Sequence, residues 1–226
     1  MIKMTNNTTN ALGKGFDRIT AVYDIVVSIS SFNRINKSQL AFLSHLSTQK
    51  TGLILGGGTG YFLQKVLDQN KEIHITYVDA SAKMIELAKK RIKEKRPNSL
   101  HRVTFTCLGA EDFEWQTYDL IVCNYFLDLF DNAFVQMMAE KFKQNLNTKG
   151  LLYVTDFNIS ETNGFIKWST QMGLKVLYLL FRWTTQLQTK QLPETEILLK
   201  EQCFSSTHSK YYLNGILACR LYKIVP

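Results

Sequence analysis

The sequence lacks several patterns that would place it in a class at once. None of its four cysteines lies at Cys-x-x-Cys spacing, so neither a zinc site nor a disulfide framework is indicated. No apolar run reaches the roughly 18 residues of a membrane-spanning helix. The polar start, residues 1–10, has no apolar core of a secretory signal. The four histidines are scattered and none is at metal-ligand spacing from another. We therefore expect a cytoplasmic protein without a metal, whose cysteines are small buried hydrophobic residues.

The net charge of +8 is concentrated in one segment. Between Lys83 and Arg96 there are seven basic and two acidic residues, which accounts for +5 of the total. Apolar residues in the same segment recur at helical spacing, so the basic residues are expected to form the solvated face of an amphipathic helix. This interpretation predicts no nucleic-acid partner, and a phosphate-binding patch is its alternative.

Apolar runs alternate with helical patterns along the chain, which is typical of an α/β sheet covered by helices. Strands are expected at 52–55, 73–78, 103–108, 118–123 and 150–156. Helices are expected at 16–46, 60–69, 81–95, 132–147 and 194–202, with Ser81 as an N-cap. The runs 205–213 and 216–225, joined by a turn at Gly215, predict an antiparallel hairpin at the sheet edge.

A glycine-rich turn follows the first predicted strand. The segment Leu53–Gly60 passes from apolar residues into Gly-Gly-Gly-Thr-Gly, and Asp79 ends the next strand. Glycines let the backbone approach a ligand closely, and a carboxylate in this position can accept hydrogen bonds from two ribose hydroxyls. The dinucleotide fingerprint needs a third glycine where Tyr61 stands. The turn therefore favours a nucleoside ligand without a pyrophosphate.

Four segments resemble, in order, the motifs of the class I S-adenosylmethionine-dependent methyltransferases: Leu55–Gly60, Tyr77–Ser81, Gly109–Phe113 and Tyr118–Asn124. The resemblance implies a Rossmann-like α/β fold, with a mostly parallel sheet, helices on both faces and an antiparallel C-terminal hairpin. It also implies S-adenosylmethionine as cofactor and S-adenosylhomocysteine as product. The cofactor contacts it implies are Gly56, Gly57, Gly58, Thr59, Gly60, Asp79, Ala80, Met84, Ala110, Glu111, Asn124 and Tyr125.

We expect residues 1–226 to form a single methyltransferase domain. Within it, 1–46 is an N-terminal helical cap, 47–157 the cofactor-binding core, 158–192 a helical insertion, and 193–226 the last helix and hairpin. The insertion contains an apolar, aromatic-rich stretch at 164–187 that we expect to close over the substrate. A homodimer interface and peripheral contact with an anionic membrane are the alternatives for this stretch.

The segment Phe16–Asp24 is similar to one in the ubiquinone/menaquinone-biosynthesis methyltransferases and their small-molecule relatives. In that family the tyrosine corresponding to Tyr23 lies near the cofactor and closes the pocket. The alternative is that Tyr23 is a core aromatic residue of an N-terminal helix.

Two positions depart from the family pattern. Ile54 stands where the family usually has an acidic residue, and Gly109 where relatives often carry aspartate. Aminopropyltransferases, which use decarboxylated S-adenosylmethionine, share the apolar residue and the triple glycine, so an enzyme of that kind is one alternative. A non-catalytic cofactor-binding protein is another.

Methyl transfer from a sulfonium is an in-line displacement, so positioning of the reactants supplies much of the rate. The expected acceptor is a small, apolar or aromatic molecule that reacts at oxygen, carbon or nitrogen. Asp128 or Asp156, which follow predicted strands, is expected to orient or deprotonate the acceptor, with Tyr23 or Tyr125 lining the pocket. The alternative for Asp128 is a helix cap or a solvated side chain.

Overall fold

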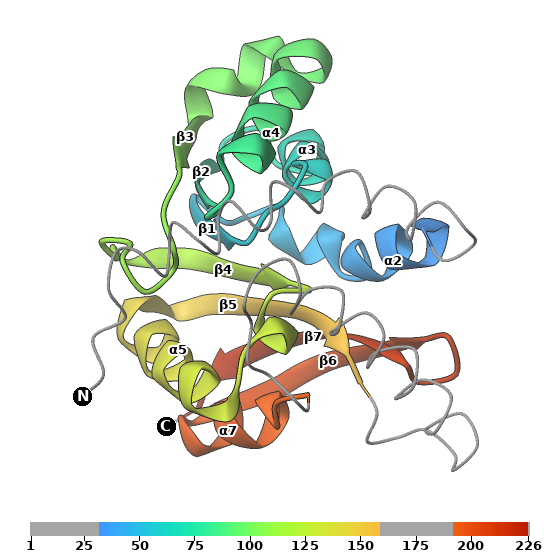
Figure 1. Ribbon diagram of the computed structural model, residues 1–226, viewed down its shortest axis with the longest axis vertical. Helices are drawn as coiled ribbons and strands as arrows, with labels where there is room; N and C mark the ends of the chain where they lie inside the picture. Colours follow the sequence, from blue (N-terminus) through green and yellow to red (C-terminus); the bar gives the residue numbers. More distant parts are fainter. Residues whose placement is uncertain (1–31, 159–191, 226) are drawn as a thin grey trace.

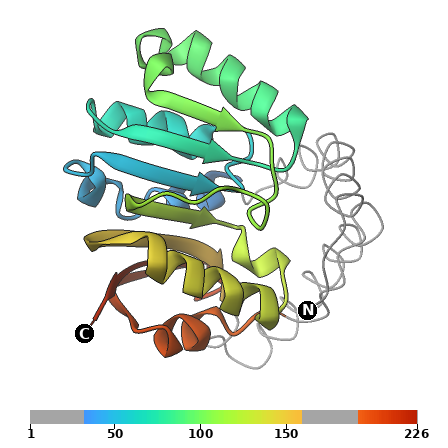
Figure 2. The ribbon, with the colours of Figure 1, turned by 90° about the vertical axis from the view of Figure 1, so that its left-hand side faces the viewer.

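The computed structural model describes residues 32–158 and 192–225. Expectations that fall on other residues, including the segment Phe16–Asp24 and the stretch 164–187, lie outside the described residues. What the structure describes is a seven-stranded sheet with helices on both faces, which confirms the predicted fold class (Figures 1 and 2).

The strand order is β3-β2-β1-β4-β5-β7-β6. The first five strands of this order run parallel, β7 pairs antiparallel with β5, and β6 pairs antiparallel with β7 as the predicted edge hairpin. The strands are β1 Thr51–Leu55, β2 His74–Val78, β3 Val103–Thr106, β4 Tyr118–Asn124, β5 Leu146–Phe157, β6 Phe204–Tyr212 and β7 Leu217–Ile224.

The predicted strands differ from the observed ones mainly at two ends. The strand expected at 103–108 ends at Thr106, where the chain leaves the edge of the parallel part of the sheet. The strand expected at 150–156 begins at Leu146, because a register shift lets Leu146 pair with Tyr118 before the regular ladder starts at Leu151.

Helices cover the two faces of the sheet separately (Figure 2). One face packs against α3 and α4 and the other against α5 and α7, as the membership of two hydrophobic clusters shows. The helices are α2 Phe32–Gln39, α3 Tyr61–Gln69, α4 Ala82–Lys95, α5 Asn132–Asn145 and α7 Thr195–Glu201, with short 3₁₀ turns η1 Leu43–Leu46, η2 Pro97–Arg102 and η3 Leu127–Leu129.

The helix expected to run unbroken to residue 46 is interrupted after Gln39. The buried Tyr153 hydroxyl of β5 donates to the Gln39 carbonyl oxygen (2.7 Å) and accepts from the Phe42 N–H (3.2 Å). These two bonds hold the chain in a turn between α2 and η1, a contact that local sequence pattern does not reveal.

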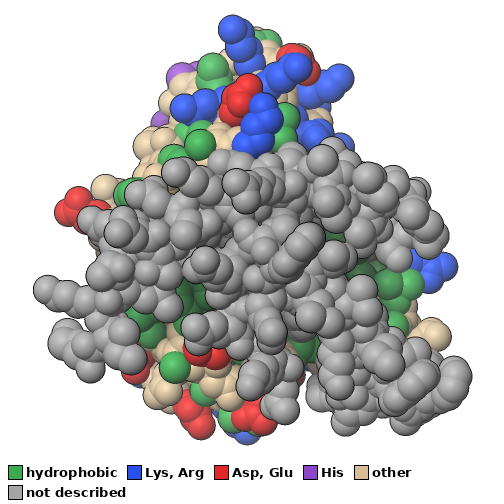
Figure 3. All heavy atoms as spheres, in the orientation of Figure 1, with side chains coloured by type: hydrophobic (Ala, Val, Ile, Leu, Met, Phe, Trp, Pro, Cys, Tyr) green, Lys and Arg blue, Asp and Glu red, His purple; other side chains and the backbone are tan. Residues whose placement is uncertain are grey.

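The predicted cap and charge pattern of α4 are confirmed. The Ser81 hydroxyl oxygen accepts a hydrogen bond from the Met84 N–H at 3.2 Å. The apolar side of α4 is buried in the core, and its lysines are exposed; the basic side chains gather over this part of the molecule in Figure 3. The solvated-face interpretation of the basic segment therefore holds.

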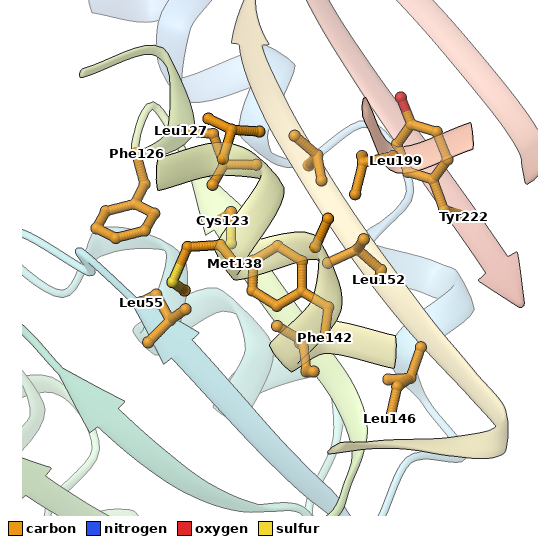
Figure 4. Packing of buried hydrophobic residues seen from close by; sticks show 14 of the residues in the cluster. Leu55, Cys123, Phe126, Leu127, Met138, Phe142, Leu146, Leu152, Leu199 and Tyr222 are labelled. Atoms are coloured by element: carbon orange, nitrogen blue, oxygen red, sulfur yellow. The ribbon is translucent and has the colours of Figure 1, made fainter. Parts of the chain in front are cut away.

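The core lies on both sides of the sheet because the central strands are covered on both faces. Along β1, Leu53 and Leu55 face α5, while Ile54 faces α3 and α4. Figure 4 shows the α5 side, where Phe142 and Met138 pack against Leu55 and Leu152.

The cysteines follow the prediction only in part. None of the four forms a disulfide; Cys123 and Cys219 are buried, Cys203 is half-buried, and the expectation of burial is wrong for Cys107. Cys107 is exposed because β3 has already ended at Thr106.

Asn70 joins three segments at the end of the sheet opposite the glycine turn. Its amide nitrogen donates to the carbonyl oxygens of Leu46 and Gln49, at 2.8 and 2.7 Å. Its amide oxygen accepts from the N–H groups of Glu72 and Ile73, at 2.9 and 3.0 Å. One buried side chain thus fixes the approach to β1 and β2.

Replacing Asn70 with alanine would leave these four backbone groups without their partners. Since an unpaired buried polar group costs about 1–3 kcal/mol, we expect Asn70→Ala to lower the free energy of unfolding by roughly 3 kcal/mol or more in urea denaturation. The exposed Asn98→Ala is the control and should change it by less than about 0.5 kcal/mol. Equal effects of the two substitutions would contradict the role given to Asn70.

Candidate cofactor and acceptor site

The strand order places the candidate site between β1 and β4. From β1 the chain continues through β2 to β3 on one side, whereas β4 leads to β5 on the other. In such a sheet, ligands bind beyond the carboxyl ends of the strands at the point where the order reverses. The glycine turn after β1 and the segment after β4 meet at this point.

Three hydrogen bonds tie the glycine turn to β2. The Gly56 N–H donates to the Val78 carbonyl oxygen (2.9 Å), and the Gly58 N–H donates to Asp79 Oδ2 (2.8 Å). The Tyr77 hydroxyl donates to the Gly58 carbonyl oxygen at 2.7 Å. The turn is therefore fixed before any ligand arrives.

The glycines of this turn differ in what surrounds them. A Cβ at Gly56 would meet the Phe126 ring, one at Gly57 the Tyr77 ring, and one at Gly60 would lie 3.0 Å from Ala88 of α4. A Cβ at Gly58, where φ is +63°, would meet nothing within 4 Å among residues 32–158 and 192–225. Gly58 is thus the position where the backbone is open to an approaching ligand.

The Asp79 carboxylate is held beside this opening. Oδ2 accepts from the Gly58 N–H and Oδ1 from the Ser81 N–H, the latter at 2.9 Å. A carboxylate offers about four acceptor sites, so orienting the turn is compatible with accepting from ribose hydroxyls. The position agrees with the role predicted for Asp79.

The other residues predicted on the adenosine side lie around the ends of β2 and β3. Ala80 is half-buried, Met84 is buried in the first turn of α4, and Ala110 is buried with its carbonyl oxygen accepting from Trp115 Nε1 at 3.2 Å. At the other departure, Gly109, a Cβ would lie 2.8 Å from the carboxylate at the flexible end of the Glu111 side chain.

The end of β4 carries a strained residue. Tyr125 has a φ of +53°, which is rare for a bulky side chain, and its N–H donates to the Thr155 carbonyl oxygen at 2.6 Å. The Tyr125 hydroxyl shares a hydrogen bond with the Ser38 hydroxyl of α2 at 2.6 Å. Before it, both amide atoms of Asn124 are buried and have no hydrogen-bond partner among the described residues.

Asp128 and Asp156 are both buried, at 3% and 6% exposure. Asp128 lies in η3, and α5 is capped by Asp131 Oδ1, which accepts from the Phe134 N–H at 2.9 Å. The alternative of a capping or solvated Asp128 is therefore wrong: the 3₁₀ turn directs this side chain inward, which the isolated sequence does not show.

The two carboxyls have raised pKa values. Burial raises the pKa of Asp128 to about 7, against a weaker effect of a hydrogen bond from its own backbone. Burial also raises the pKa of Asp156 well above its usual range, and the charge of Asp128 raises it further. The Arg220 guanidinium and the backbone of Phe126 and Tyr125 act on Asp156 in the opposite direction. The pair therefore holds a proton near neutral pH.

Arg220 is chiefly paired elsewhere. Its Nη2 lies 3.1 Å from Glu196 Oε2 of α7, and its guanidinium lies 5.4 Å from the centre of the Tyr211 ring. Its charge lowers the pKa of Asp156, in opposition to the effect of burial.

The structure brings together the glycine turn, Asp79, Asn124 and the acid pair, and it adds two residues that sequence reasoning missed. Phe126 closes the turn at Gly56, and Tyr77 supports it at Gly57. Tyr23 lies outside the described residues. Within 32–158 and 192–225, no group of three His, Cys, Asp or Glu side chains could hold a metal ion, and no helix is long and apolar enough to cross a membrane.

Comparison with known proteins finds similarity to methyltransferases over part of the chain. The sequence pattern of the family described as "Methyltransferase domain" matches residues 53–152, from β1 into β5. The chain is 33% identical over 106 residues to the malonyl-[acyl-carrier protein] O-methyltransferase of Acetivibrio thermocellus, a match that covers 46% of this chain and 35% of that protein. Residues 53–152, which include the glycine turn and Asp79, thus match a methyltransferase domain.

Other methyltransferase-like proteins share parts of this chain or its fold. The carboxy-S-adenosyl-L-methionine synthase of Campylobacter jejuni serotype O:23/36 is 28% identical over 145 residues, covering 62% of this chain and 60% of that one. An O-methyltransferase family protein from Burkholderia thailandensis has the same fold, with a TM-score of 0.69 and 15% identity over 92% of this chain and 60% of its own. The chain thus spans between about a third and 60% of the length of these curated relatives.

The residues present suit the methyltransferase cofactor. The open backbone at Gly58 and the carboxylate of Asp79 provide a backbone cradle and a ribose acceptor, and Tyr61 leaves the turn without the glycine of a pyrophosphate site. S-adenosylmethionine carries a ribose and no pyrophosphate, so the turn and the cofactor are compatible.

Replacing Asp79 with alanine removes both the ribose acceptor and the bond to the Gly58 N–H. Hydrogen bonds to charged groups contribute about 1.5–3 kcal/mol, so we expect the Kd for S-adenosylhomocysteine in calorimetry to rise about 10- to 100-fold. Glu86→Ala, an exposed acid on α4, is the control and should leave the Kd unchanged. An unaltered Kd for Asp79→Ala would show that the ribose site lies elsewhere.

Proposed function

We propose that this chain transfers a methyl group from S-adenosylmethionine to a small apolar or aromatic acceptor. The observation that carries the proposal is the open backbone at Gly58 beside the Asp79 carboxylate. Both lie at the carboxyl ends of the strands, where the strand order reverses. S-adenosylmethionine, when bound, supplies a methyl group on a positively charged sulfur. The acceptor atom attacks this methyl carbon in line, and the sulfur leaves as a neutral thioether. The protein's part is to align the acceptor and exclude water.

The second part of the proposal concerns Asp128 and Asp156, which lie near the carboxyl ends of β4 and β5. We propose that one of the two carboxyls, Asp128 or Asp156, is ionised near neutral pH and takes the proton that the acceptor hydroxyl loses as its oxygen–methyl bond forms. The other carboxyl stays protonated and donates a hydrogen bond. The relatives named O-methyltransferases favour oxygen as the acceptor atom.

An aromatic cluster supports an apolar acceptor. Phe126 packs on the turn at Gly56, and its ring centre lies 5.1 Å from that of Phe130. Phe130 in turn stacks on Phe134 at 3.9 Å. The buried ring of Phe126 and the half-buried rings of Phe130 and Phe134 form an apolar surface beside the glycine turn, which suits an apolar or aromatic molecule.

The proposal also includes a cytoplasmic location and a small-molecule acceptor in place of a nucleic acid. The four free cysteines agree with a reducing compartment. The lysines of α4 are exposed to solvent, which favours a solvated helix face over a nucleic-acid surface.

Calorimetry with three ligands tests the function against its rivals. We expect S-adenosylmethionine and S-adenosylhomocysteine to bind more tightly than decarboxylated S-adenosylmethionine. A preference for the decarboxylated ligand would favour an aminopropyltransferase, since Ile54 leaves the position of the usual acid apolar. No binding of any of the three would contradict both kinds of enzyme.

The raised pKa of Asp128 predicts a pH-dependent stability. An aspartate of ordinary pKa, near 4, that titrates at about 7 in the folded state binds more protons when folded between these values. Stability should therefore fall as pH rises from 5 to 8, by roughly 3 kcal/mol. In urea denaturation, Asp128→Asn should flatten this slope.

Asp131→Asn is the matched control for this measurement, because it makes the same chemical change on an exposed aspartate three residues away and keeps a capping side chain. It should retain the slope of the unaltered protein. Identical slopes for all three proteins would show that Asp128 does not hold a proton in the folded state.

A further inference from the structure

The position that lacks the usual acid lies next to an unusual tyrosine. Ile54 of β1 and Tyr77 of β2 are register partners in neighbouring parallel strands, and both are buried in the cluster on the α3 and α4 side. The exposed fractions of Ile54 and Tyr77 are 2% and 0%. A carboxylate side chain at position 54 would therefore lie beside the Tyr77 side chain.

Tyr77 holds the glycine turn through two contacts. Its ring occupies the space where a Cβ of Gly57 would lie, and its hydroxyl donates to the Gly58 carbonyl oxygen at 2.7 Å. Burial, and then the charge of Asp79, raise the pKa of Tyr77 well above its usual range, so the hydroxyl keeps its proton and remains a donor.

This bond fixes the direction of the next peptide group. In a planar trans peptide the C=O and N–H bonds point in opposite directions. Because the Gly58 carbonyl points to Tyr77 in the core, the N–H of Thr59 points away from it. That N–H makes no hydrogen bond among the described residues, and the neighbouring Gly58 is the glycine with open space before it.

The same peptide stretch is held from the other end. Arg91 Nε of α4 donates to the Thr59 carbonyl oxygen at 2.9 Å. α3 begins at Tyr61, and its N-cap, Gly60, supplies no side-chain cap. A donor held in place next to an uncapped helix start attracts an anionic group more strongly than a neutral one.

We propose that Tyr77 is a positioning residue that aims the Thr59 N–H at the carboxylate of the cofactor's methionine end. Ile54, its register partner on β1, has no polar group that could hold the turn in this way. This inference rests on the proposed function, because it needs the cofactor in the crevice at Gly58. It concerns the methionine end alone, whereas Asp79 is expected to bind the ribose hydroxyls.

Two ligands that differ at the methionine end test the proposal. S-adenosylhomocysteine carries the amino acid group, and methylthioadenosine carries the same adenosine and sulfur without it. In calorimetry, we expect Tyr77→Phe to raise the Kd for S-adenosylhomocysteine about 10-fold and to change that for methylthioadenosine less than twofold. A residue that merely stabilises the fold would weaken both ligands alike.

Tyr118→Phe is the matched control, since it removes a buried hydroxyl from a strand outside the turn. It should change neither Kd. Equal weakening of both ligands by Tyr77→Phe, or no change in either, would overturn the positioning role. Failure of the unaltered protein to bind S-adenosylhomocysteine would instead contradict the proposed function.

A second measurement needs no substitution. In ¹⁵N-resolved NMR spectra of the unaltered protein, the Thr59 amide proton should move downfield on addition of S-adenosylhomocysteine and not on addition of methylthioadenosine. The same shift with both ligands, or with neither, would show that the Thr59 N–H does not meet the carboxylate.

Discussion

The candidate site depends on one contact, the seating of the glycine turn on Tyr77. The ring leaves no room for a Cβ at Gly57, and the hydroxyl holds the Gly58 carbonyl. With the Gly58 N–H on Asp79, both polar groups of one residue are tied to β2. Such a turn is preorganised, so a ligand that binds there does not have to order it. The register of β1 against β2 places Ile54 beside Tyr77 and thus sets the geometry of the glycine turn.

The two buried carboxyls of the candidate acceptor site are governed by the cost of burying charge. Burying a carboxyl is costly unless it is neutral or paired, and the raised pKa values of Asp128 and Asp156 reduce this cost because the pair retains a proton near neutral pH. A fold selected only for stability would avoid such a pair, and perturbed acids gather at functional sites more often than elsewhere. The rings of Phe130 and Phe134 stack on each other and add apolar surface to the hydrophobic cluster on the α5 side.

The sequence allowed much of this fold to be predicted, because the rules involved are local. Apolar runs identified the strands, and Ser81 was recognisable as a cap from its place after Asp79. The features that were missed depend on contacts distant in sequence. Tyr77 looks like any strand aromatic until Gly58 is seen above it, and the break after Gln39 is made by Tyr153. The inward turn of Asp128 follows from the packing of η3.

A crystal structure of the protein with S-adenosylhomocysteine tests the central claim most directly. The account predicts the ribose hydroxyls on the Asp79 carboxylate and the ligand backbone over Gly58, between the ends of β1 and β4. It also predicts that the Tyr77 hydroxyl keeps its bond to the Gly58 carbonyl in the complex. A ligand bound away from this edge, or a turn that swings off Tyr77 to receive it, would contradict the account.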